Sequence, residues 1–434
     1  MRDILVTLLF TIAAFAAIKR PYYGALLWVW IGLMNPHRLG WGFAYSLPFG
    51  LIAAAVTLIG IVFSPKDVRW PKGAPLAVLA MLTLWMGLTT MTAIHVDYSV
   101  SKYLEVLKVL VMVFVVAALV RTKEEIIGLI VIVVGSIGFF GFKGGIFTVL
   151  TGGAYRVWGP PSSLVNGNNE LAVALVISIP LIYFLVQQVA LLHRNRFLKR
   201  FSERWIKIGL YAVIVLSAVA AIGSQSRGAF LAVGAMCGML WWRSRSKLAL
   251  TMALLALIPA ILLMMPESWY ERMGTIETYD QDRSAMGRIN AWTMAINIAN
   301  DRFLGAGFST ATKYVYEMYA PDPSYVLVAH SIYFQILGEH GYFGLALYLL
   351  FWALTYRTAG KLVKLGAMKA QLHWAVQLGS MAKVSLVGFA VGGAFLSLAY
   401  WDMPYYVMVA LVAALRLVRE ELEGPGGAVR GSYA

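Results

Sequence analysis

Thirteen apolar runs separated by polar connections constrain the fold of this chain more than any other feature. An α-helix needs about 20 apolar residues to cross the hydrocarbon core of a bilayer. Only 13% of the residues are charged, against roughly a quarter in soluble domains, which excludes a water-soluble enzyme. Because the first two runs are short, the pattern predicts an all-α polytopic membrane protein with about 12 transmembrane helices. The runs cover residues 4–18, 22–34, 47–63, 74–94, 104–120, 126–142, 171–192, 206–222, 229–242, 248–265, 332–354, 374–398 and 405–417.

Basic side chains gather in three connections, and these set the predicted orientation. The connections cover residues 193–205, 243–247 and 357–369. Each pair is separated by an even number of runs, so the positive-inside rule places all three in the cytoplasm. These loops contribute most of the net charge of +15, which therefore does not indicate a nucleic-acid partner.

Alternation then places residues 143–169, 224–228, 266–330 and 400–402 on the outer side. The predicted domain organisation follows from this order. It consists of N-terminal transmembrane helices at 1–265, a large outer loop at 266–330, C-terminal transmembrane helices at 331–418 and a cytoplasmic tail at 419–434.

The first run is expected to remain part of the protein. It is followed by Lys19, Arg20 and Pro21 rather than by a small-residue cleavage site, so we predict an uncleaved first span. The pair Lys19 and Arg20 marks either a tight turn between two helices or a break in one irregular crossing.

The outer loop is predicted to be partly helical. Ser284 can cap a helix that runs to about Asn300, and a second helical piece is expected at 310–318, ending near Pro321. In the first piece, the apolar residues at helical spacing are Ile289, Trp292, Ile296 and Ala299. In the second, the residues expected at the membrane interface are Tyr314, Tyr316 and Tyr319.

The turn SQSRG is the clearest candidate for anion binding. Arg227 stands in this turn directly before a predicted helix, whose N-terminus points outward and exposes unpaired backbone N–H groups. Together with Ser224, Ser226 and the guanidinium, this N-terminus suits a phosphate or pyrophosphate. The alternative is an arginine that extends to lipid headgroups.

Arg288 and His330 lie on the same predicted face. Arg288 falls in the first turn of the expected outer helix, where a cation opposes the helix dipole unless an anion is close. Its alternative role is a solvated charge or a salt bridge to Asp280 or Asp282. His330 precedes the run at 332–354, and the dipole there favours a neutral ring that can accept a proton.

Other outward polar residues are weaker candidates. Lys143, Arg156 and Asn168 lie in a loop rich in residues that bind phosphate or sugar hydroxyls, although Asn-Gly-Asn-Asn is also an ordinary turn. Tyr400 could stack on a sugar ring or belong to the interfacial aromatic belt. Glu339 and His340 are expected to form a buried structural pair.

Several classes of chemistry have no signature in the sequence. It contains no Gly-rich phosphate-binding motif of the ATPase type, no H-E-x-x-H and no paired-cysteine motif. No metal and no cofactor are therefore predicted. The single cysteine, Cys237, lies in an apolar run and is interpreted as a small packed side chain.

Three short motifs, in order along the chain, resemble the O-antigen ligase and polysaccharide polymerase superfamily. They are SRGA from Ser226, G-R-x-x-x-W from Gly287, and H-S-x-x-x-x-x-x-G from His330, which continues as EHGYFGLALYL. The N-terminal MRD and the run PYYGALLWVWIGLMNPHRLGWGFA are similar to a subgroup described as O-glycosylation ligases. The resemblance covers most of the chain.

The resemblance implies a multi-pass enzyme of the bacterial inner membrane whose active site and large loop face the periplasm. It implies metal-independent, inverting transfer of a glycan from undecaprenyl pyrophosphate to a sugar hydroxyl of lipid A-core. Membrane lipids are the other implied partners. Arg227 and Arg288 would bind the donor pyrophosphate, and His330 would act as base or positioning group. Substrate binding by Lys143, Arg156, Asn168, Ser226 and Tyr400 is inferred from the residues alone.

The acceptor is not readable from the sequence. A polymerase that joins lipid-linked repeats or a protein O-glycosylation ligase would share these motifs. A lipid-glycan transporter is the alternative from another class, but transporters tend to show repeated halves and charges near the membrane midplane. Here no repeat is visible and most of the distinctive charges face outward.

Overall fold

The computed structural model describes nearly all of the chain outside residues 244–282 and the C-terminal tail. The described residues are 1–70, 72–195, 197–243 and 283–424, with positions 246–248, 251, 252, 255, 259, 267 and 270 between the last two ranges. All regular structure in them is helical, which confirms the all-α prediction. Each predicted apolar run coincides with a helix except 248–265, which lies largely outside the described residues.

The helices are separated by short connections. Their bounds are α1 (Arg2–Lys19), α2 (Pro21–Met34), α3 (Phe49–Phe63), α4 (Ala74–Met91), α5 (Val96–Leu119), α6 (Lys123–Leu150), α7 (Asn168–Gln187), α8 (Val189–Leu192), α9 (Glu203–Gly223), α10 (Arg227–Arg243), α13 (Arg283–Asp301), α14 (Lys313–Tyr319), α15 (Ile332–Gly366), α16 (His373–Gly393) and α17 (Met403–Glu423). Short 3₁₀ turns lie in several of the connections.

The start of α6 anchors the first helical hairpin. Thr122 and Glu125 form a reciprocal capping box, which satisfies backbone N–H groups that the helix itself leaves without partners. The Glu125 carboxylate also accepts a bond from Arg20 at 2.7 Å, and the Tyr22 hydroxyl donates to the Glu125 carbonyl at 2.8 Å. Since α1 and α2 pack against each other, Arg20 occupies a tight turn rather than a break in one crossing.

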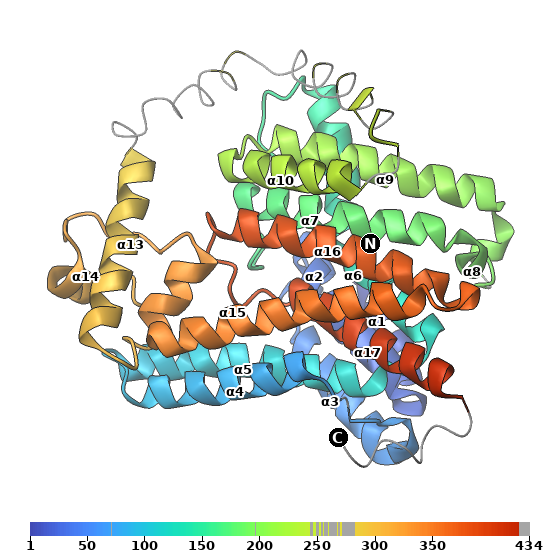
Figure 1. Ribbon diagram of the computed structural model, residues 1–434, viewed down its shortest axis with the longest axis horizontal. Helices are drawn as coiled ribbons and strands as arrows, with labels where there is room; N and C mark the ends of the chain where they lie inside the picture. The colour runs from blue at the N-terminus through green and yellow to red at the C-terminus, as the bar shows by residue number, and fades with distance from the viewer. Residues whose placement is uncertain are drawn as a thin grey trace.

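The long helices form a bundle around α7 and α17. α6 packs on α9, α7 on α16, and α15 on both α4 and α16. Every residue of α17 from 403 to 415 is buried, so this helix lies inside the bundle. Figure 1 shows α4, α15, α16, α7 and α9 running alongside one another, with α13 standing across one end of the bundle.

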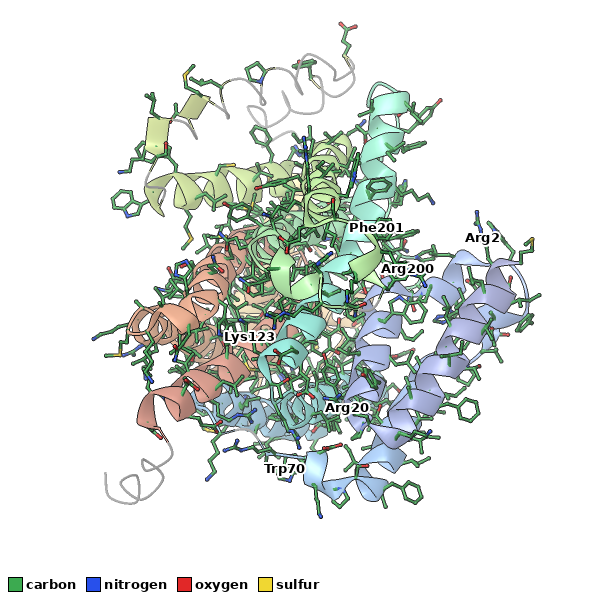
Figure 2. The ribbon with its side chains drawn as sticks, turned by 90° about the vertical axis from the view of Figure 1, so that its right-hand side faces the viewer. Arg2, Arg20, Trp70, Lys123, Arg200 and Phe201 are labelled. Atoms are coloured by element: carbon green, nitrogen blue, oxygen red, sulfur yellow. The ribbon has the colours of Figure 1, made fainter. Side chains whose placement is uncertain are left out.

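The two ends of the bundle differ in their side chains. The N-termini of α7, α10 and α15 lie at the end where α13 and α14 are found (Figure 1). Lys123 and Arg200 lie at the opposite end, which faces the viewer in Figure 2. The basic connection that carries Arg200 therefore lies at the end of the bundle opposite to α13 and α14.

Five helical segments are long and apolar enough to cross a membrane, so the protein is a multi-pass membrane protein. They are Ala74–Met91, Lys123–Leu150, Asn168–Gln187, Glu203–Gly223 and Ala370–Gly393. This number, taken over the described residues, is below the predicted count of about 12. α2 and α3 are apolar but shorter, and charged residues within α1, α5 and α17 lower their mean hydropathy.

The described part of the predicted outer loop, residues 283–330, contains the two expected helices with shifted bounds. α13 begins at Arg283, so Ser284 lies inside the helix rather than capping it, and Arg288 falls beyond the first turn. The buried face of α13 differs from the predicted stripe, since Ile289 and Ile296 are exposed. It consists of Gly287, Asn290, Ala291, Met294, Ala295, Ile298 and Ala299.

The second helix, α14, begins after the N-cap Thr312, whose hydroxyl accepts a bond from the Val315 N–H. Its three tyrosines do not form one interfacial surface. Tyr316 is fully buried and donates its hydroxyl to the Leu327 carbonyl, whereas Tyr314 is exposed. The interfacial prediction is therefore wrong for Tyr316, because this ring fills the small core between α13 and α14.

Close packing of α6 on α9 depends on glycine, and this gives a stability test. A Cβ at Gly145 would clash with the backbone of Leu216, whereas a Cβ at Gly135 meets nothing within 4 Å. Gly145→Ala should therefore destabilise the protein by roughly 1–3 kcal/mol through overpacking. Gly135→Ala, the control on the same helix, should be neutral or stabilising because alanine favours helix. Thermal unfolding in detergent measures both, and equal melting temperatures would contradict the packing.

Candidate functional site

The turn between α9 and α10 is held rigidly from α7. The side-chain amide of Asn168 donates to the Ser224 carbonyl at 2.7 Å, and both residues are buried. Gln225 adopts a left-handed backbone (φ 57°). The Ser226 hydroxyl accepts a bond from the Ala229 N–H at 3.2 Å, as an N-cap does. Arg227 is thereby fixed at the first position of α10.

The connection from α6 to α7 packs against the same turn. The Gln225 side-chain amide donates to the Gly153 carbonyl at 3.3 Å, and the Arg156 Nε donates to the Gln225 side-chain oxygen at 3.5 Å. Arg156 itself is exposed. The structure therefore brings Arg156, Asn168, Ser226 and Arg227 together, from the two connections that the sequence predicted on one side.

Contacts from α13 position the segment that carries His330. The Trp292 indole donates to the Ala329 carbonyl at 2.7 Å and stacks on Phe334 with ring centroids 4.9 Å apart. The His330 N–H donates to the Ser397 hydroxyl at 3.0 Å. His330 has a left-handed backbone (φ 43°), so its ring direction is set by tertiary contacts rather than by a regular helix.

Arg288 connects the two halves of the site electrostatically. Burial, followed by the positive charge of Arg288, lowers the pKa of His330 below its ordinary value. Arg288 also interacts with the Glu170 carboxylate in the first turn of α7, two residues after Asn168. Both causes favour the neutral form of the His330 ring, and the charge of Arg288 acts on both His330 and Glu170.

The turn between α16 and α17 closes the arrangement. A Cβ at Gly228, the residue after Arg227, would touch Phe395 at 3.2 Å. Phe395 stands two residues before Ser397, which holds the His330 backbone. Arg227, Arg288 and His330 therefore lie at one end of the bundle, around the starts of α7, α10 and α15.

Two of the predicted binding residues lie elsewhere. Lys143 is an exposed residue inside α6, which continues to Leu150, so the loop predicted to start at this lysine starts later. Tyr400 is buried and does not present its ring to a sugar in this conformation. Direct substrate contacts by these two residues stay predictions.

Tyr400 belongs to a buried polar network with the predicted pair Glu339 and His340. Its hydroxyl donates to the Glu339 carboxylate and lies 2.9 Å from His340 Nε2. The other ring nitrogen of His340 lies 2.7 Å from the Thr89 hydroxyl on α4. Glu339 and His340 are both buried, which confirms the buried pair and adds Tyr400 to it.

Two residues of the site were missed by the sequence reasoning. Glu170 is an acidic residue in the first turn of α7, which is a common stabilising position and carried no functional signal. Ser397 contacts His330 only through the tertiary fold. Among the described residues, no group of three or more His, Cys, Asp or Glu side chains is placed to hold a metal ion.

Part of the chain that forms this site matches a known protein family. Residues 212–349 match the family model described as O-antigen ligase, and residues 1–190 match a family of unknown function. No curated protein matches the chain. The first match contains Arg227, Arg288 and His330, so the predicted catalytic residues lie inside the O-antigen ligase segment.

The neighbouring Arg288 charge makes the titration of His330 testable. Arg288→Gln removes one of the two causes that lower the pKa of His330, so this pKa should rise toward the ordinary value of about 6.5. Histidine-selective NMR of the ¹³C-labelled protein in detergent measures it, with the His330→Gln spectrum giving the assignment. Arg283→Gln, on the same helix but over the Tyr325 ring, should leave the pKa unchanged. An unshifted titration in Arg288→Gln would remove Arg288 from the surroundings of His330.

Proposed function

We propose, from the O-antigen ligase domain that this chain carries at residues 212–349, that the protein is a glycosyltransferase that uses a lipid-linked donor. It moves a glycan from undecaprenyl pyrophosphate to a sugar hydroxyl of lipid A-core. The observation that carries the proposal is the convergence of Arg227, Arg288 and His330 at one end of a membrane-embedded bundle. The reaction class follows from the family, and the acceptor is part of the proposal.

The proposed transfer breaks the bond between the anomeric carbon and the pyrophosphate oxygen and forms a bond to the acceptor hydroxyl oxygen. Negative charge develops on the departing pyrophosphate, and two guanidiniums stabilise it without proton transfer. The acceptor proton passes to the His330 ring, whose lowered pKa favours the neutral form that can accept it. The products are the glycosylated acceptor, with inverted anomeric configuration, and undecaprenyl pyrophosphate.

The buried Asn168 and Ser226 position the Arg227 turn in this scheme. Asn168 holds the Ser224 carbonyl and Ser226 caps α10, so both act through Arg227 rather than on the substrate itself. Arg156 is exposed beside the turn and is the better candidate for contact with the donor glycan.

The proposed setting is the bacterial inner membrane, with the candidate site in the periplasm. The cluster of basic side chains at the opposite end supports this orientation through the positive-inside rule. We extend the five apolar segments to about 12 spans, because seven further helices pack within the same bundle, namely α1, α2, α3, α5, α10, α15 and α17. The proposed organisation keeps a large periplasmic loop at 266–330 between transmembrane helices at 1–265 and 331–418.

An assay with purified protein, a polyprenyl-pyrophosphate glycan and lipid A-core tests the proposal. Arg227→Ala and Arg288→Ala should each reduce transfer about 10²- to 10³-fold, as expected when a group that stabilises developing charge is removed. Lysine at either position should rescue poorly, since it cannot make the bidentate contact. Arg283→Ala, on the outer face of α13, is the matched control and should keep activity.

The product identifies the acceptor class. A glycan joined to lipid A-core supports a ligase, whereas extended lipid-linked chains would identify a polymerase. Wild-type-like transfer in both arginine-to-alanine variants would remove these arginines from the site.

His330 is tested separately, because a base and a positioning group respond differently to substitution. His330→Ala should reduce turnover roughly 10²- to 10⁴-fold while donor binding survives. His330→Gln can hydrogen-bond the acceptor but cannot take its proton, so loss in both variants supports a base and activity in the glutamine variant supports positioning. Melting temperatures control for folding. Loss of donor binding with normal turnover at saturating donor would assign His330 to the pyrophosphate site instead.

A further inference from the structure

A cleft lined by basic side chains lies at the end of the bundle opposite to the candidate site. It has a volume of about 640 Å³ and is formed by the segment before α4, the second half of α15 and the end of α17. Trp70, which lines it, lies on the end face shown in Figure 2. The basic side chains that line this cleft are Arg69, Lys72, Arg357, Lys361, Arg416 and Arg419.

The cleft holds more positive charge than its own acids neutralise. Only Glu420 and Glu423 line it beside the six basic residues, and Glu420 pairs with Arg69 at 2.6 Å. Within the described part of the chain, Lys72, Arg357, Lys361 and Arg419 make no salt bridge. Like charges gathered in one concave site repel one another unless an anion enters.

Apolar side chains also line the cleft, and they favour some anions over others. Leu354, Val412 and Leu415 line it together with the basic residues. The exposed Trp70 indole stands at its edge, as tryptophans do at the level of lipid headgroups. A free phosphate would contact only the charged side chains, whereas a phospholipid would contact the charged and the apolar side chains.

We propose that this basic cleft binds an anionic phospholipid, with the headgroup phosphate on Lys72, Arg357 and Lys361 and an acyl chain along Leu354 and Val412. Basic pockets between transmembrane helices on the cytoplasmic side are suited to such headgroups. The site is separate from the proposed glycan-transfer site and does not depend on its chemistry.

Native mass spectrometry of the detergent-solubilised full chain tests the proposal with dioleoylphosphatidylglycerol as the probe. The wild-type protein should retain this lipid and bind dioleoylphosphatidylcholine more weakly. Arg357→Gln combined with Lys361→Gln should weaken phosphatidylglycerol binding roughly 10- to 30-fold, given the attraction that each basic residue contributes near a membrane. The control pair Lys199→Gln and Arg200→Gln removes two charges at the same end of the bundle but outside the cleft, and should bind as wild type does.

Two further measurements decide among the alternatives. Lys72→Gln should also weaken binding. Because Lys72 is exposed in the segment before α4, this substitution changes none of the helices that form the cleft. Millimolar inorganic phosphate should not displace the lipid, and full displacement would overturn the lipid assignment in favour of free phosphate. Equal loss in the cleft pair and the control pair would overturn the site, because it would show nonspecific attraction to the basic end.

Discussion

The satisfaction of backbone polar groups at helix ends is the constraint on which the rest of this structure depends. In an apolar surrounding, a helix satisfies its own interior N–H and C=O groups but leaves its terminal ones without partners. The Asn168 amide supplies a partner for the Ser224 carbonyl at the end of α9. The same bond fixes the start of α10, so one buried interaction both completes a helix end and positions Arg227.

The kink in α15 follows the same rule. Gly341 has a positive φ of 69° and interrupts the helix, which frees the carbonyls before it. The Ala306 and Gly307 N–H groups donate to the Gly338 and Glu339 carbonyls, each at 2.9 Å. The segment after α13 is therefore tied to α15 by the backbone, and the network of Glu339, His340 and Tyr400 lies just beneath this junction.

The sequence predicted most helices because each apolar run is long enough to be read directly as a helix. The predicted end of α6 was wrong, because the glycines there allow close helix packing and do not form a turn. GFKGG reads as a loop, but Gly144 and Gly145 let α6 approach Val157 and α9 closely, as small residues do between membrane helices. α6 therefore continues past Lys143, and the lysine lies on a helix surface.

The alternation of apolar runs and basic connections was enough to predict that Arg227, Arg288 and His330 lie at one end of the molecule. Their mutual placement was not predictable, since it depends on interactions made only in the tertiary fold. Ser397 binds the His330 N–H, Trp292 binds the neighbouring Ala329 carbonyl, and Glu170 interacts electrostatically with Arg288. The environment of Tyr400 was also not predictable from the sequence. An aromatic residue near a predicted membrane boundary can equally be a buried hydrogen-bond donor, and periodicity does not distinguish these environments.

The left-handed backbone at His330 lowers the stability of the folded protein at a position where the proposed function requires the histidine ring. A non-glycine residue in this region costs about 1–2 kcal/mol relative to a relaxed backbone, and glycine adopts it without that strain. Selection for thermostability alone would therefore favour replacing the ring with glycine, whereas selection for the proposed transfer would retain it. A stabilised but inactive variant at residue 330 would be the evolutionary signature of a histidine kept for its chemistry.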